Sequence, residues 1–169
     1  MLNSSASADG LSLRPARASD GPFLQRLYHS ARADLQWIDG EQEQIEQIVA
    51  QQFQVQERGI GEEFPNAMHY VVEKLATPIG VISADFGVNE IRVLYLAFIP
   101  TARGKGYGRI VLRGVQQAAQ QVRCPVATVV WASNPHARQH YLALGFQVEE
   151  THLMAQRLVW YPDQPALAL

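Results

Sequence analysis

The fold is decided by residues 91–108, which read Ile-Arg-Val-Leu-Tyr-Leu-Ala-Phe-Ile-Pro-Thr-Ala-Arg-Gly-Lys-Gly-Tyr-Gly. The apolar run from Ile91 to Ile99 is rich in β-branched and aromatic residues, which predicts a buried strand that stops at Pro100. Apolar residues then recur at helical spacing from Ile110 to Ala119. The segment is therefore expected to form a strand, a glycine-rich loop and a helix in direct succession.

The glycine-rich loop, residues 103–108, has the properties of an anion-binding site. Its backbone N–H groups lie at the positive end of the following helix, where glycines let a ligand approach the backbone closely. The glycines and the neighbouring cations are Gly104, Gly106, Gly108, Arg103, Lys105 and Arg109. A pyrophosphate is the natural occupant. The alternative is a glycine-rich turn that only reverses the chain.

Two common nucleotide-binding motifs do not fit this loop. No Gly-Lys pair is followed by Ser or Thr, as the Walker motif requires, and the glycine spacing differs from G-x-G-x-x-G. Nucleoside triphosphates and dinucleotides are therefore disfavoured as ligands.

The rest of the chain predicts a mixed sheet covered by helices. The expected elements are a strand at Leu11–Leu13, a helix after Ser19-Asp20, a helix from Ile45 that ends by Gly59 or Gly61, a hairpin of 70–72 and 79–82 separated by Ala76-Thr77-Pro78, a strand at Val126–Trp131, a helix at Pro135–Leu144 and two strands within 146–159. We expect a flexible leader at 1–10, one domain at 11–162 and a tail at 163–169.

Composition excludes several classes of protein. The chain has 169 residues, is 47% hydrophobic and carries a net charge of −2, without a basic block that would indicate nucleic acid binding. It lacks an apolar run long enough to cross a membrane and a signal peptide, so a cytoplasmic location is expected. Its single cysteine, Cys124, agrees with a reducing compartment. A homodimer is the assembly that base rates favour.

Two segments resemble the GNAT superfamily of acetyl-CoA-dependent N-acetyltransferases. The first is Pro100-Thr-Ala-Arg-Gly-Lys-Gly-Tyr-Gly108, which is similar to the family signature Gln/Arg-x-x-Gly-x-Gly/Ala after a hydrophobic strand. The second is residues 132–146, with Asn134, Ala137, Tyr141 and Gly145-Phe146 at the family spacing. The resemblance implies a mixed, mostly antiparallel sheet of six to seven strands with about four helices, splayed between the fourth and fifth strands.

The resemblance also implies where acetyl-CoA, or CoA, would bind. In such enzymes the pantetheine arm enters the splay and pairs with the edge of the fourth strand, here around Ala97 and Phe98. The Phe98 N–H would polarise the thioester carbonyl. The cofactor-binding residues implied are Ala97, Phe98, Arg103, Gly104, Lys105, Gly106, Tyr107, Gly108, Asn134 and Tyr141.

Two of these residues have structural alternatives. Tyr141 is the candidate general acid for the departing thiolate, and its alternative is a packed helix aromatic. Asn134 would contact the pantetheine amide, and its alternative, an N-cap before Pro135, is compatible with that role. Phe98 and Tyr141 are thus the two catalytic candidates.

The general base stays open. Family members with a Glu on the fourth strand would place it where this chain has Arg92, and a Glu on the fifth strand is matched by Val129. Glu90 or Asp85 could act through water, although an exposed, solvated carboxylate is the simpler interpretation of each.

No metal is expected. His136 and His140 are four residues apart but have no third ligand nearby in the sequence. An acetyl-cysteine route through Cys124 is disfavoured, because no His partner lies nearby in sequence. Direct transfer to a primary amine on a small molecule or peptide is preferred. The second hypothesis is a GNAT-like module that binds or senses CoA without catalysis. The segment 34–41, with Trp37, lies where the family builds its acceptor pocket, but no acceptor residue is assigned there.

Overall fold

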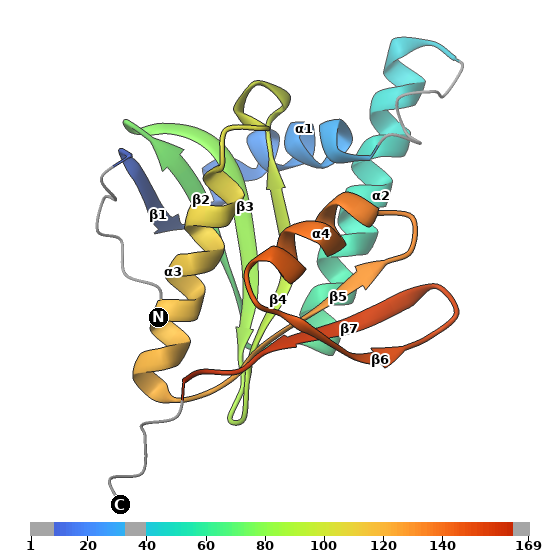
Figure 1. Ribbon diagram of the computed structural model, residues 1–169. Helices are drawn as coiled ribbons and strands as arrows, with labels where there is room; N and C mark the ends of the chain where they lie inside the picture. Colours follow the sequence, from blue (N-terminus) through green and yellow to red (C-terminus); the bar gives the residue numbers. More distant parts are fainter. Residues whose placement is uncertain (1–8, 33–39, 164–169) are drawn as a thin grey trace, which may run out of the picture.

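The computed structural model describes residues 9–32 and 40–163. The expected leader and tail, and the segment around Trp37, lie largely outside these ranges. The described helices are α1 (Gly21–Ala31), α2 (Gln42–Glu63), α3 (Tyr107–Val122) and α4 (Pro135–Ala143) (Figure 1). The strands are β1 (Leu11–Pro15), β2 (Ala67–Lys74), β3 (Thr77–Phe86), β4 (Ile91–Phe98), β5 (Val126–Trp131), β6 (Gln147–Thr151) and β7 (Ala155–Trp160).

The strands form one sheet of seven in the order β1-β2-β3-β4-β5-β7-β6. All neighbouring pairs are antiparallel except β4 and β5. The predicted mixed, mostly antiparallel sheet of six to seven strands is therefore confirmed. None of the helices in the described ranges is long and apolar enough to span a membrane.

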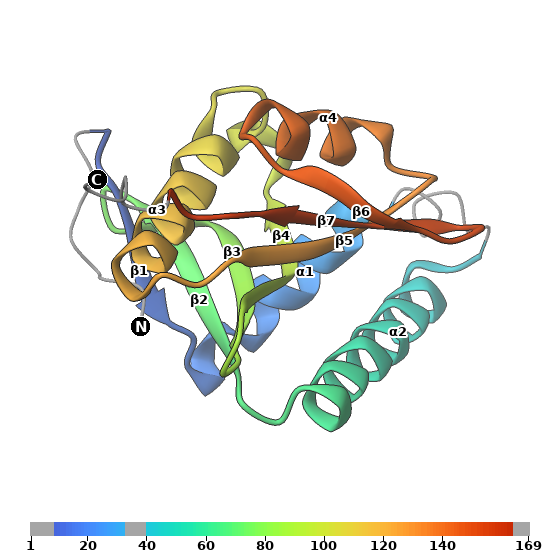
Figure 2. The same ribbon diagram turned by 60° about the horizontal axis from the view of Figure 1, so that its bottom comes forward.

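Helices cover both faces of the sheet. Viewed along the sheet, α3 and α4 lie on one face, and α1 and α2 lie on the other (Figure 2). The apolar residues of α3 follow the helical period, and Val111, Leu112 and Val115 are buried against the strands. This packing fixes the direction in which α3 leaves the glycine-rich loop.

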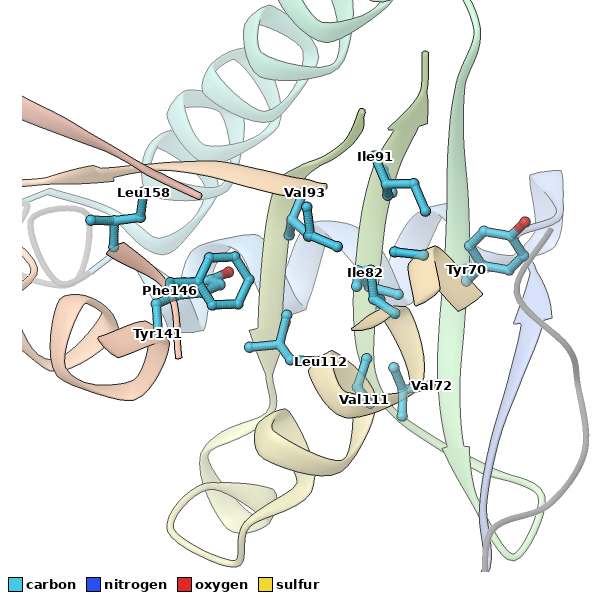
Figure 3. Packing of buried hydrophobic residues seen from close by; sticks show 14 of the residues in the cluster. Tyr70, Val72, Ile82, Ile91, Val93, Val111, Leu112, Tyr141, Phe146 and Leu158 are labelled. Atoms are coloured by element: carbon cyan, nitrogen blue, oxygen red, sulfur yellow. The ribbon is translucent and has the colours of Figure 1, made fainter. Parts of the chain in front are cut away.

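The largest core cluster lies between the sheet and the α3 and α4 layer. Ile82 and Val93 of the central strands face Val111 and Leu112, while Tyr141 and Phe146 close the cluster beside Leu158 (Figure 3). Burying an apolar side chain of this size stabilises a fold by roughly 1.5–3 kcal/mol, so this layer holds the two motif-bearing segments together.

Helix α2 is longer than the sequence predicts. The prediction that it ends by Gly59 or Gly61 is wrong, because it continues to Glu63. Each glycine costs a helix about 1 kcal/mol relative to alanine, but it does not prevent helical geometry. The helix ends where Phe64 precedes Pro65, because proline disfavours the helical conformation of the residue before it.

The β2–β3 hairpin is confirmed, but its turn lies earlier than expected. Thr77 and Pro78 belong to β3, and the turn consists of Leu75 and Ala76. Both have positive φ angles, 48° and 66°, a conformation that two-residue hairpin turns usually reserve for Asn and Gly. The sequence carried no such turn signal, which explains the misplaced boundary.

The splay between β4 and β5 is confirmed. These parallel strands pair only at Ile91–Val93 with Val126–Thr128. Beyond that point β4 continues to Phe98 and β5 to Trp131, but the two strands no longer pair with each other. The opening therefore begins at Val93 and Thr128 and faces the end of β4 that leads into the glycine-rich loop.

Candidate active site

The glycine-rich loop leaves its backbone accessible, as an anion cradle would require. A short 3-10 turn at Pro100–Ala102 ends β4, and α3 begins directly after Gly106. Gly104 and Gly106 have φ angles of 73° and 82°, in the left-handed region that favours glycine. An ideal Cβ on either residue would meet no atom within 4 Å, so the loop backbone is open on that side. The N–H groups of the first turn of α3 point out of the helix start.

The Arg103 side chain is directed toward the protein. Its Nε donates to the carbonyl oxygen of Phe98 at 2.9 Å, and its Nη2 donates to the carbonyl oxygen of Ser30 at 3.1 Å. The guanidinium therefore connects the loop with the ends of β4 and α1. An anion at the loop would therefore meet the loop backbone and not the Arg103 side chain.

Tyr107, the first residue of α3, is also held by another element. The Lys74 Nζ of β2 donates to the Tyr107 hydroxyl, and the ammonium lies 4.8 Å from the centre of the ring. This contact anchors the start of α3 to the sheet. Lys105 and Arg109 are exposed at the same end of the helix, where their charges favour an anion.

The free edge of β4 presents backbone groups to the splay. The Ile99 N–H donates to the carbonyl oxygen of Ile79 in β3. Successive residues of a strand direct their N–H groups to opposite edges of the strand. The N–H of Phe98 therefore points toward β5, as the resemblance implied, and so does that of Leu96. Sequence reasoning did not single out Leu96. Ala97 is buried against Leu27 of α1.

The ring of Phe98 packs under the loop. A Cβ on Gly80 would lie 2.7 Å from this ring, and one on Gly108 would lie 3.5 Å from it. Gly80 is therefore required by close approach, and the Phe98 ring lies against the start of α3 at Gly108. The side chain of Phe98 positions structure, while its N–H is directed into the opening.

Tyr141 lies at the vertex of the splay. It is 7% exposed and packs edge-on against Phe146 at 5.0 Å between ring centres (Figure 3). Its hydroxyl interacts electrostatically with Thr128, whose own hydroxyl donates to the Val93 carbonyl at 3.1 Å. Burial raises the pKa of Tyr141 to about 12, although the neighbouring Thr128 hydroxyl acts in the opposite direction.

Asn134 forms the N-cap of α4. Its Oδ1 accepts a hydrogen bond from the Ala137 N–H at 3.2 Å, directly before Pro135. The capping interpretation is confirmed. The cap orients α4 and thereby Tyr141, about two turns further along the helix.

The view of Glu90 as an exposed, solvated carboxylate is wrong. Its two oxygens accept hydrogen bonds from Arg92 at 2.6 Å and from Arg157 at 2.5 Å, and its side chain is 21% exposed. Burial acts to raise its pKa, but the two arginines outweigh burial and lower it. A carboxylate held by two guanidinium groups is a weak base, so Glu90 is unsuited to deprotonate an amine.

The remaining candidates form no reactive centre. Within the described parts of the chain, no three His, Cys, Asp or Glu side chains come together as metal ligands. His136 and His140 are exposed on α4. Burial raises the pKa of the Cys124 thiol, which disfavours the nucleophilic thiolate.

A second polar cluster lies under α1 and α2, on the other face of the sheet. It contains Glu57 of α2, His69 of β2, Ser83 of β3 and Tyr95 of β4, which line one small cavity. Sequence reasoning missed this cluster because its four members come from four elements. The period-2 pattern of β4 would have placed Tyr95 on the same face as Val93, but a register irregularity between these two residues turns Tyr95 toward α1 and α2.

The comparison with protein families identifies the fold. Residues 24–146 match the acetyltransferase (GNAT) family, and the chain belongs to this family. It is therefore an acetyltransferase whose donor is acetyl-CoA. The open loop backbone and the unpaired edge of β4 at the splay fit that cofactor.

Solved structures agree in fold at low sequence identity. The PaiA N-acetyltransferase of Thermoplasma acidophilum, solved with coenzyme A, is 17% identical with a TM-score of 0.68, over 89% of this chain and 98% of that one. An acetyltransferase of Thermus thermophilus is 22% identical with a TM-score of 0.66, over 89% and 96%. The ribosomal-protein-S18-alanine N-acetyltransferase of Escherichia coli is 14% identical with a TM-score of 0.65, over 94% and 98%. No curated protein matches the chain.

Proposed function

We propose that the protein transfers an acetyl group from acetyl-CoA to a primary amine on a small molecule or peptide, directly and in a ternary complex. The observation that supports this proposal is the splay at Val93 and Thr128, where the free edge of β4 leads into the glycine-rich loop and Thr128 is a neighbour of Tyr141.

The loop backbone at 103–108 would hold the diphosphate, with Lys105 and Arg109 adding charge. The edge of β4 at Ala97 and Phe98 would hold the pantetheine arm, and Asn134 would contact its amide. The N–H of Phe98, or that of Leu96 on the same edge, would hydrogen-bond the thioester oxygen, a type of contact worth about 3 kcal/mol in acyl transfer.

Tyr141 would interact with the sulfur of the departing CoA thiolate. A phenol with a pKa of about 12 is a weaker acid than a thiol, whose ordinary pKa is about 8.5. Tyr141 is therefore suited to donate a hydrogen bond to the sulfur, with solvent completing the proton transfer. To do so its O–H would point toward the opening.

Direct transfer is tested by steady-state kinetics. We expect thiol release from acetyl-CoA in the presence of an amine, with intersecting lines when both substrates are varied. Parallel lines would contradict direct transfer. Cys124→Ser is the matched control for a covalent route, because Cys124 is the only cysteine, and this variant should keep full activity.

The same assay separates catalysis from CoA binding alone. A panel of amines, amino acids and peptides should contain an acceptor that releases thiol above the hydrolysis rate. Tight binding of acetyl-CoA with no acceptor in the panel would favour a CoA-sensing module instead. A donor of this kind is consistent with a cytoplasmic location, and gel filtration would test for a homodimer.

A further inference from the structure

The ammonium group of Lys74 lies at the start of α3, beside the glycine-rich loop. Its Nζ donates to the Tyr107 hydroxyl at 2.5 Å and lies 4.8 Å from the centre of the Tyr107 ring. Tyr107 directly follows Gly106, the N-cap of α3. A residue of β2, 33 positions earlier in the chain, therefore brings a positive charge to the loop. Sequence reasoning missed Lys74, because the contact joins two elements that are far apart in the sequence.

The backbone of Lys74 is held on both sides. In the sheet Lys74 pairs with Leu11 of β1 and with Thr77 of β3. The next residue, Leu75, donates its N–H to the Gly10 carbonyl oxygen at 3.1 Å. The side chain therefore extends toward α3 from a fixed base, and a charge carried by a paired strand is positioned more precisely than one carried by a loop.

Lys74 forms no ion pair with a carboxylate among the residues that the structure describes. The neighbouring Glu73 pairs instead with Arg14 at 3.2 Å. The Lys74 side chain is half-buried, and it lies near the positive end of α3, where Lys105 and Arg109 add further positive charge. Like charges that gather without a counter-ion repel one another, so this arrangement favours the binding of an anion.

The lysine ammonium also has donors to spare for an anion. It has three N–H groups, and the Tyr107 hydroxyl accepts one of them. Within the described ranges no other acceptor engages the remaining donors. Among the 14 Lys and Arg residues of the chain, the lysines are Lys74 and Lys105, and both lie at this end of α3.

We propose that Lys74 is a cofactor-binding residue whose ammonium group binds a phosphate of CoA, while Tyr107 holds that ammonium in place. This inference rests on the proposed diphosphate site at the loop and adds a residue of β2 to it. CoA carries a diphosphate and a 3′-phosphate, and both present the anionic oxygen atoms that a lysine ammonium binds.

Calorimetry with two ligands tests the proposal and identifies the phosphate. We expect Lys74→Met to raise the Kd for CoA about tenfold, because it removes a charge-assisted hydrogen bond, and Lys74→Arg should recover most of the affinity. An equal rise in the Kd for 3′-dephospho-CoA would assign Lys74 to the diphosphate. A rise for CoA alone would assign it to the 3′-phosphate. An unchanged Kd for both ligands would overturn the proposal.

Further variants separate charge from packing. Tyr107→Phe keeps the ring beside the ammonium and removes only the hydroxyl, so it should raise the Kd for CoA less than about threefold. If the contact only anchored α3, Tyr107→Phe and Lys74→Met would weaken CoA binding equally, and that result would contradict the proposal. Arg113→Met, an exposed change on α3, is the matched control for loss of a positive charge and should leave the Kd unchanged.

Salt dependence gives a readout that packing would not move. The Kd for CoA should rise more steeply with NaCl concentration in the wild type than in Lys74→Met, because salt screens a charge that the variant lacks. Equal salt dependence of the two proteins would count against a contact between Lys74 and phosphate.

Lysine labelling tests the contact without any substitution. Because the chain has two lysines, peptide mass spectrometry resolves both after acylation with an N-hydroxysuccinimide ester. We expect saturating CoA to slow the labelling of Lys74 about tenfold or more, whereas pantetheine, which lacks phosphate, should give no protection. Labelling of Lys74 at the same rate with and without CoA would overturn the proposal.

The two proposals fail differently. If CoA binds the wild type and Lys74→Met with equal affinity, the role of Lys74 is wrong and amine acetylation stands. If CoA binds in the predicted way but no amine or peptide is acetylated, the proposed function is wrong and the role of Lys74 in binding stands.

Discussion

Arg103 and Phe98 are joined by a hydrogen bond of 2.9 Å, from the guanidinium Nε to the carbonyl oxygen. The same guanidinium donates to the Ser30 carbonyl at 3.1 Å, so one side chain ties the end of β4 to the glycine-rich loop and to α1. The strand end that Arg103 holds is the one at which the acetyl group is proposed to lie. Arg103 is therefore a positioning residue in this arrangement.

Replacing Arg103 should impair turnover more than cofactor binding. We expect Arg103→Ala to lower kcat about tenfold, because it removes charge-assisted hydrogen bonds worth roughly 1.5–3 kcal/mol, while the Kd for CoA changes less than about threefold. Arg103→Lys should recover part of the rate. Arg113→Ala, an exposed change on α3, is the control. A loss of CoA affinity that accounts for the whole effect would instead assign the guanidinium to the diphosphate.

Gly106 should be essential for cofactor binding, because its φ angle favours glycine and the space around its Cα is empty. Gly106→Glu brings a carboxylate to the anion cradle and strains a φ of 82°, so calorimetry should detect no acetyl-CoA binding. Gly106→Asn is the matched control, because Asn tolerates the left-handed region, and it should retain measurable affinity. Wild-type affinity in a folded Gly106→Glu protein would refute the cradle.

Tyr141→Phe should lower kcat about 10- to 100-fold, with acetyl-CoA affinity nearly unchanged. The estimate follows from losing one hydrogen bond to a charged sulfur, worth about 1.5–3 kcal/mol. The ring and its packing on Phe146 remain, so the melting temperature is compared to control for stability. A change in kcat below about threefold would leave Tyr141 a packing residue. Thr128→Val should affect the rate less, because Thr128 is a neighbour of the phenol and is not proposed to contact the sulfur.

Asp20 should make folding sensitive to acid. It is 7% exposed and accepts two hydrogen bonds from Arg14 at 2.8 Å, which lower its pKa to about 2 from an ordinary 3.8. At pH values above the pKa of Asp20 in the unfolded chain, the lowered pKa contributes about 2 kcal/mol to the free energy of unfolding. This contribution is lost as the pH falls toward 2. In urea titrations, Asp20→Asn should therefore cost about 2 kcal/mol at pH 7 and almost nothing near pH 2. The exposed Asp9→Asn should be neutral throughout, and a pH-independent loss at Asp20 would exclude the linkage.

Ala76→Gly should stabilise the protein. Ala76 has a φ of 66° in the β2–β3 turn, where a non-glycine residue costs about 1 kcal/mol. Glycine relieves that cost but makes the unfolded chain more flexible, so the expected net gain is about 0.5 kcal/mol, read as a rise in melting temperature. Ala50→Gly, the same substitution inside α2, should destabilise by about 1 kcal/mol. A lower melting temperature for Ala76→Gly would show that the turn is not strained.

Much of the cofactor side of the site could be predicted from sequence. The apolar run of β4, Pro100 and the three loop glycines act over short distances, so they predict a strand, a cradle and a helix without knowledge of the rest of the chain. The same holds for the Asn134 cap, because its bond to Ala137 closes within one helical turn. Strand pairing and the splay were implied by the family resemblance, not by the spacing of residues.

Only the tertiary structure decided the features that join distant segments. Glu90 is paired with Arg157, Arg103 with Ser30, and Tyr95 shares a cavity with Glu57, and in each case the partner belongs to another element. Hydrophobic period and turn chemistry fix which face of an element is buried, but they do not fix what lies against that face. Which polar groups meet under α1 and α2 depends on how these helices cross β2, β3 and β4, and this is settled by packing among side chains far apart in the sequence.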